Sequence, residues 1–181
     1  MRKSHSKSND LTTSRLTFAE AAIEGGTHGA DKATLDEALS GLGRVITDQV
    51  FGSRSSRRAQ VQDLVGTLCL MEANLSNLEA DFEDAITASA DAVSDVWSEL
   101  KDSKAIGAHR HLGEAYRDRG MFRRDRGKSG AESDLTKAID IFTQVEAAYR
   151  AGTSDGTTAD SKRSADATAD EITEIAALIA P

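Results

Sequence analysis

Six cationic side chains lie within twelve residues of a chain whose formal net charge is -8. They are Arg117, Arg119, Arg123, Arg124, Arg126 and Lys128. Clustered Arg and Lys bind phosphate and carboxylate groups, so the cluster predicts contact with nucleic acid or with an acidic partner surface. Met121 and Phe122 stand among these cations. They favour a protein interface, because apolar side chains beside Arg are typical of interfaces.

A second interpretation of the same cluster stays open. The segment from Gly120 to Gly130 is expected to be a loop, and its cations can pair with Asp118, Asp125 and neighbouring carboxylates. Met121 and Phe122 can then pack back onto the core. The net negative charge also opposes a general affinity of the whole chain for nucleic acid.

Other residue combinations predict no catalytic or metal site. Gly127-Lys128-Ser129 is similar to the end of a phosphate-binding loop, but Phe122 stands where that motif requires Gly. His109 and His111 are two residues apart on an expected helix and therefore point to opposite sides. The single Cys, Cys69, lies in an apolar stripe, which indicates a buried thiol. We therefore predict a protein that is not an enzyme and needs no cofactor.

The elements that carry these residues are expected to be helices. One Pro and 4% aromatic residues argue against a sandwich or barrel, and Ala, Leu, Glu and Arg fill the periodic segments. The sequence predicts an all-α fold, either a helical bundle or a short helical-hairpin solenoid of six or seven helices. Residues 1–8 are expected to form a disordered tail and residues 9–181 one domain, with a linker at 153–158. A cytoplasmic location is expected, because no signal-peptide core or membrane-length apolar run follows the N-terminus.

A long apolar stripe between Val61 and Leu100 is the strongest pattern in the sequence. Its spacing of alternately three and four residues indicates helix throughout. Ser76 and Glu79 have the spacing of a capping box, so a hairpin that restarts there is an alternative. The continuous apolar phase favours one unbroken helix. The positions expected to be buried include Leu68, Leu75, Leu78 and Phe82.

The segment from His109 to Tyr149 resembles a tetratricopeptide repeat. Leu112, Gly113 and Tyr116 match the first helix of that repeat, and Ala138 and Phe142 match the second. About a dozen extra residues separate the two halves, and the closing Pro of the repeat is absent. A second copy is suggested by residues 80–85. The resemblance implies stacked helical hairpins, a concave groove for a partner peptide and a capping helix after Thr158.

The resemblance also implies which side chains line that groove. On the matching helix these are Arg110, Glu114 and Arg117, and in the upstream copy they are Asn74 and Asn77. Asn amides suit an extended peptide, because they both donate and accept hydrogen bonds.

Three functions remain as hypotheses at this point. The leading one is a non-enzymatic helical adaptor, or scaffold, for a protein or peptide partner. The first alternative is a helical subunit of a nucleoprotein complex that contacts phosphates through the Arg-rich loop. The second is a structural subunit that forms homo-oligomers through coiled-coil contacts of the long stripe. No membrane partner is expected.

Overall fold

The computed structural model describes residues 3–26, 31–47, 56–94, 99–152 and 158–180, and these residues contain seven α-helices and no strand. The helices are α1 (Lys3–Gly26), α2 (Lys32–Thr47), α3 (Ser56–Ser76), α4 (Glu79–Ser94), α5 (Ser103–Asp125), α6 (Ala131–Ala151) and α7 (Thr158–Ile179). The predicted all-α class is confirmed, and the helix number lies in the predicted range. In the described part of the chain, no helix combines the length and the apolar character that a membrane span requires.

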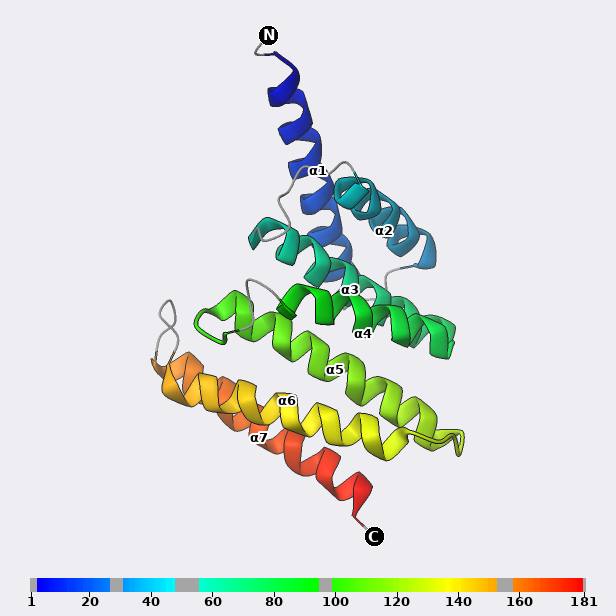
Figure 1. Ribbon diagram of the computed structural model, residues 1–181, viewed down its shortest axis with the longest axis vertical. Coiled ribbons are helices and arrows are strands. Elements are labelled where there is room, and N and C mark those ends of the chain that lie inside the picture. Colours follow the sequence, from blue (N-terminus) through cyan, green and yellow to red (C-terminus); the bar gives the residue numbers. More distant parts are fainter. Residues whose placement is uncertain (1–2, 27–30, 48–55, 95–98, 153–157, 181) are drawn as a thin grey trace.

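The helices follow one another along the long axis of the molecule, so the two termini lie at opposite ends (Figure 1). α1 and α2 form the N-terminal end, and α7 forms the C-terminal end. Each helix packs against the next one in the sequence; in addition, α1 contacts α3, and α3 contacts α5. The helices α1, α3 and α5 therefore form a row of direct neighbours.

Apolar side chains at helical spacing form the interior. In the N-terminal part, Leu16, Leu35 and Leu42 pack with Val61 and Leu68 of α3 in one buried cluster. Burying a side chain of this size contributes about 1.5–3 kcal/mol. Two larger clusters fill the middle and the C-terminal part, with Phe82, Phe122, Phe142 and Ile175 among their members, and a small third cluster consists of alanines of α3, α4 and α5.

The long apolar stripe forms a helical hairpin, so the prediction of one unbroken helix is wrong. α3 ends at Ser76 and α4 begins at Glu79. Asn77 between them has a positive φ of 55°, which Asn tolerates better than most residues. The Oγ of Ser76 accepts a hydrogen bond of 3.2 Å from the N–H of Leu78. These local features reverse the chain, although the apolar phase passes through the turn without a slip.

The turn exposes two leucines that were predicted to be buried. Leu75 and Leu78 are 56% and 59% exposed, whereas Leu68 and Phe82 are buried as predicted. Leu75 lies in the last turn of α3, and Leu78 lies in the connection to α4. Once the chain reverses, the spacing of the stripe no longer directs these two positions toward the core.

The predicted loop from Gly120 to Gly130 is mostly helix. α5 continues to Asp125, which leaves residues 126–130 as the connection to α6. Gly120 is buried at the contact with α6, where a Cβ would lie 2.8 Å from the Cγ of Leu135. The extra residues in the segment that resembles a tetratricopeptide repeat therefore lengthen α5 and do not form a long loop.

The start of the first helix differs markedly from the prediction. α1 begins at Lys3, so residues 3–8, which were expected to be a disordered tail, are part of a helix. α2 begins at Lys32, where the Oδ1 of Asp31 accepts a hydrogen bond of 2.8 Å from the N–H of Thr34 and so caps the helix. Residues 153–157 of the predicted linker at 153–158 lie outside the described residues, and α7 begins at Thr158.

Candidate functional site

The cations near the C-terminal end of α5 bind a buried carboxylate of α6. The side chain of Asp134 is 3% exposed and accepts hydrogen bonds from two arginines. Arg119 donates to it through Nε at 2.9 Å and Nη2 at 2.8 Å, and Arg123 donates through Nη1 at 2.8 Å. Such charge-assisted pairs position both guanidinium groups. Arg119 and Arg123 are therefore bound within the fold and are not presented to a partner.

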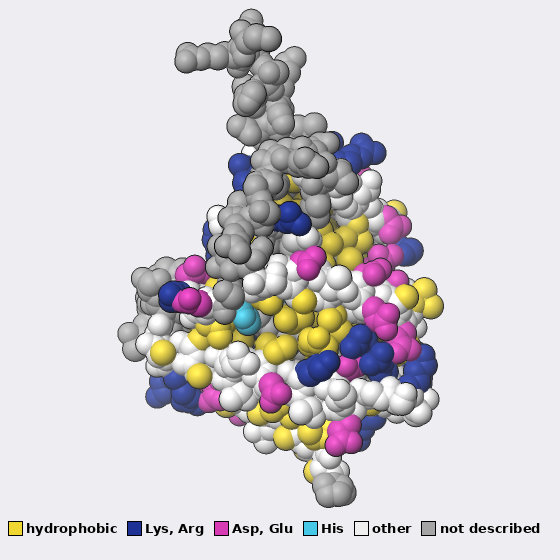
Figure 2. All heavy atoms as spheres, viewed as in Figure 1, with side chains coloured by type: hydrophobic (Ala, Val, Ile, Leu, Met, Phe, Trp, Pro, Cys, Tyr) yellow, Lys and Arg dark blue, Asp and Glu magenta, His cyan; other side chains and the backbone are white. Residues whose placement is uncertain are grey.

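Glu79 at the start of α4 joins the same cluster. Its Oε1 accepts a hydrogen bond of 2.6 Å from Arg123 Nε, and its Oε2 accepts one of 2.5 Å from Lys128 Nζ. The hydrogen bond from Lys128, followed by that from Arg123, lowers the pKa of Glu79 to about 2. The α3–α4 and α5–α6 turns are therefore tied together by ion pairs at one edge of the molecule. Figure 2 shows Lys and Arg side chains among Asp and Glu side chains at this edge.

Phe122 packs onto the core, which was the second interpretation left open by the sequence. It is 7% exposed, and its ring centroid lies 5.2 Å from that of Phe82. The guanidinium of Arg126 lies 3.9 Å from the ring centroid of Phe122, and the ammonium of Lys128 lies 5.2 Å from it. Arg124 is exposed and has no ion-pair partner in the described part of the chain. Most of the cations predicted to contact a partner are thus occupied within the protein.

A second group of predicted residues forms a polar network across α3, α5 and α7. Asn74 of α3 donates to Asp118 at 3.2 Å, and Arg117 donates to the same carboxylate at 2.8 Å. Arg117 also bonds Glu171 of α7. Arg110 donates hydrogen bonds of 3.0 Å to Glu171 and of 3.0 Å to Glu114, which lies one turn further along α5.

This network brings together four of the residues predicted to line a groove, namely Asn74, Arg110, Glu114 and Arg117. The network connects three helices from distant parts of the sequence. It therefore fixes how α3, α5 and α7 are oriented relative to one another. Asn77, the fifth predicted groove residue, lies instead in the α3–α4 turn, where its positive φ serves the chain reversal.

A groove of about 650 Å³ lies beside this network, between α5 and α7. Its α5 side includes Arg110, Arg117 and Met121, all of which the sequence analysis proposed as partner-binding residues. Met121 is 41% exposed, which is high for a large apolar side chain. The apolar residues of the α7 side are Ala167, the half-buried Leu178 and Ile175, which is only 2% exposed and belongs mainly to the core. The groove therefore combines apolar contact surface with charged groups held in place, as ligand-binding clefts commonly do.

None of the residues on the α7 side of the groove was predicted from the sequence. Its residues are Ala167, Asp170, Glu171, Glu174, Ile175 and Leu178. The signal that α7 offers is a repeat of carboxylates at positions 170, 171 and 174 beside the apolar positions 175 and 178. Nothing in the sequence shows which helix this face meets, because its partners lie more than fifty residues away on α5.

His111 links α3 to α5 next to the polar network. Its Nδ1 lies 2.8 Å from the Oδ1 of Asp63 and 3.4 Å from the hydroxyl of Thr67. Burial lowers the pKa of His111, but the hydrogen bond and charge of Asp63 outweigh burial and raise it above its ordinary value. Cys69 is half-buried beside the cluster that contains Phe82, and this burial raises the pKa of its thiol to about 12. The described residues include no group of three or more His, Cys, Asp or Glu side chains placed to hold a metal ion.

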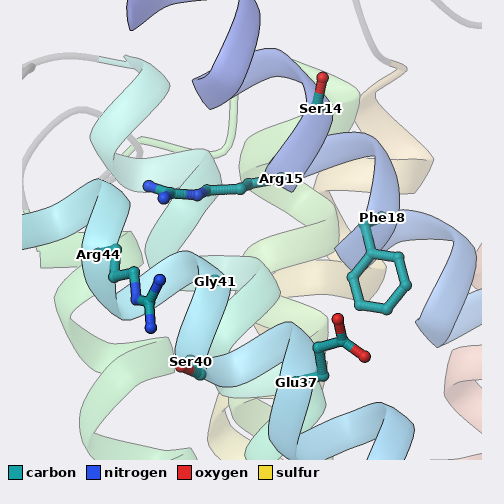
Figure 3. A pocket seen from close by; sticks show the side chains of 7 residues that line it. All are labelled: Ser14, Arg15, Phe18, Glu37, Ser40, Gly41 and Arg44. Carbon is teal, nitrogen blue, oxygen red and sulfur yellow. The ribbon is translucent and has the colours of Figure 1, made fainter.

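A smaller hollow of about 330 Å³ lies between α1 and α2 and contains none of the predicted site residues. Figure 3 shows the guanidinium groups of Arg15 and Arg44 on one side of it, and the ring of Phe18 and the carboxylate of Glu37 on the other. It has about half the volume of the groove between α5 and α7, so the larger groove is the better candidate for a binding site.

Comparison of the chain with protein-family models, with curated proteins and with solved structures gave no match. Its function therefore has to be inferred from the arrangement of its own side chains.

Proposed function

We propose that this chain is a non-enzymatic helical scaffold that binds a segment of a protein or peptide partner in the groove between α5 and α7. The observation that carries the proposal is the exposure of Met121 in a groove whose other wall contains the half-buried Leu178. When a partner covers an exposed apolar side chain inside a cleft, the burial of apolar surface favours binding.

The rigidity of the groove supports this proposal. Arg110 and Arg117 on one wall are both bonded to Glu171 on the other, so the walls are joined by ion pairs. Side chains that are already fixed lose little conformational entropy when a partner binds. A preformed groove is what a scaffold for an extended or helical segment needs.

The resemblance to a tetratricopeptide repeat fits the same proposal. In the α5–α6 pair, Gly113 lies against Phe142, where a Cβ would be 2.7 Å from the ring atom Cε1. Small residues at such crossings let two helices of a hairpin approach closely. In a helical-hairpin scaffold the first helices of successive hairpins line the binding face. With α5 as such a first helix and α7 as the next, the groove between them is the expected location of a partner.

A selection experiment tests the proposal. The full chain is immobilised and used to select binders from a displayed library of random peptides, and a selected peptide is then synthesised for affinity measurement. Met121→Ala should weaken the binding of that peptide about 10-fold or more, because the truncation removes an exposed apolar contact from the groove. Leu78→Ala is the matched control, since Leu78 is also a large exposed apolar residue but lies outside the groove.

The control variant should bind like the unchanged chain. Equal binding by the Met121→Ala variant, or failure of the selection to yield any specific peptide, would contradict the proposed function.

A further inference from the structure

Two carboxylates on the α7 side of the groove have no ion-pair partner among the described residues. Asp170 and Glu174 are one helical turn apart, both are exposed, and both line the groove. Glu171, between them in the sequence, is different, because it accepts hydrogen bonds from Arg110 and Arg117. The α7 wall therefore carries one carboxylate that is neutralised within the fold and two that are not.

The arginines of the groove cannot neutralise this excess charge. Arg117 is shared between Glu171 and Asp118, and Arg110 is shared between Glu171 and Glu114. The carboxylates bonded to these two arginines thus already outnumber them. Asp170 and Glu174 add further negative charge, so the groove as a whole is acidic.

The apolar groups of the groove lie on both walls beside these free carboxylates. Met121 lies on α5, and Leu178 of α7 follows Glu174 by one helical turn. A partner side chain that covers Met121 and Leu178 would remove water from the neighbouring carboxylates. That loss of solvation is unfavourable unless the partner also supplies a positive charge.

We propose that the segment bound by this groove is basic as well as apolar, with Lys or Arg within about one helical turn of a Leu, Ile or Met anchor. The inference rests on the proposed function, since it specifies the partner of the same groove. Opposite charge on the two partners also speeds their encounter, and the net charge of -8 on this chain acts in the same direction. An acidic segment would be repelled by both the groove and the chain.

The test repeats the peptide selection on a variant in which the two free carboxylates are neutralised, Asp170→Asn with Glu174→Gln. The matched control carries the same change of charge on an exposed part of α6 outside the groove, Glu132→Gln with Asp140→Asn. The unchanged chain and the control should both enrich peptides that place Lys or Arg beside an apolar anchor. The groove variant should still enrich the apolar anchor but lose the preference for Lys and Arg. A basic peptide selected by the unchanged chain should bind the groove variant about 3- to 10-fold more weakly.

The outcomes separate this inference from the proposed function. Selected peptides that are neutral or acidic, and whose binding is weakened by Met121→Ala, would overturn the inference and leave the groove as a binding site. Equal enrichment of basic peptides by the groove variant would also overturn it. Peptides whose binding is unaffected by Met121→Ala would overturn the proposed function itself, and the inference with it.

Discussion

Arg119 of α5 and Asp134 of α6 form a two-pronged ion pair that is almost closed to solvent, with side chains that are 13% and 3% exposed. Both hydrogen bonds are short, at 2.8 and 2.9 Å. Arg119 belongs to the segment with the highest density of positive charge, positions 117–128. Its pairing with Asp134 shows that part of this charge holds the α5–α6 hairpin together.

Asp134→Asn should therefore destabilise the protein strongly. The substitution keeps the shape of the side chain but leaves the charges of Arg119 and Arg123 without their buried counterion, which should cost about 3–5 kcal/mol in the free energy of unfolding. Arg124→Ser is the control, because Arg124 is exposed and has no ion-pair partner in the described part of the chain; its effect should stay within about 0.5 kcal/mol. Urea unfolding, monitored by circular dichroism, measures the free energy of unfolding of both variants. Similar stability of the two variants would show that the buried pair is not needed.

Gly66→Ala should also destabilise, because α3 and α4 meet closely at this position. A Cβ on Gly66 would lie 2.2 Å from the Oγ of Ser89 and 3.0 Å from its backbone nitrogen, so the helices would have to separate. Overpacking of this kind costs about 1–3 kcal/mol. Gly107→Ala in α5 is the matched control, since a Cβ there meets nothing within 4 Å. It should stabilise by about 0.5–1 kcal/mol through helix propensity. Opposite signs of the two shifts in melting temperature are expected, and a stabilising Gly66→Ala would contradict the close crossing.

Truncation of the stripe leucines should divide them into two classes. Leu68→Ala should cost about 2–5 kcal/mol, because Leu68 is fully buried. Leu75→Ala and Leu78→Ala should each change the free energy of unfolding by less than about 0.5 kcal/mol, because both side chains flank the α3–α4 turn and are exposed. Denaturant unfolding of the three variants measures this division. A large loss for Leu78→Ala would instead favour the continuous helix.

The stability of the protein should depend on pH through His111. The raised pKa of His111 means that the folded state holds its proton more tightly than the unfolded state. The resulting stabilisation is complete below the ordinary pKa of His, about 6.5, and is lost as the pH rises through the higher pKa of the folded state. His111→Gln should remove this part of the pH dependence. Urea unfolding at several pH values between about 6 and 8.5 measures it. The difference in the free energy of unfolding between the His111→Gln variant and the unchanged chain should change over this range. A constant difference would contradict a raised pKa of His111.

The sequence predicted the helices better than their ends. The apolar spacing identified Leu68 and Phe82 correctly as buried, because a helix covered on one side needs apolar residues at that spacing. The unbroken helix was favoured over a hairpin turn at Asn77. The apolar spacing continues unchanged through the turn, so it does not reveal that the chain reverses there. The end of α5 was placed too early, because Gly120 has the appearance of a helix stop although it serves a close contact with Leu135.

The candidate site was predicted in part. Arg110 and Arg117 were identified on an expected helix and Met121 in the loop expected after it, and all three line the same groove. The partners of the other cations were not foreseen, because Asp134 and Glu79 reach them only through the packing of separate helices. Local sequence shows the charge of a side chain, but the helix packing decides whether that charge is consumed inside the fold or left for a partner.

The most direct test of partner binding is a nuclear magnetic resonance titration of the methyl-labelled chain with a peptide obtained by selection. If the peptide binds between α5 and α7, the methyl signals of Met121 and Leu178 should shift together and saturate at one affinity, while those of Leu75 and Leu78 stay in place. Shifts confined to Leu75 and Leu78, with the groove signals unchanged, would contradict binding between α5 and α7.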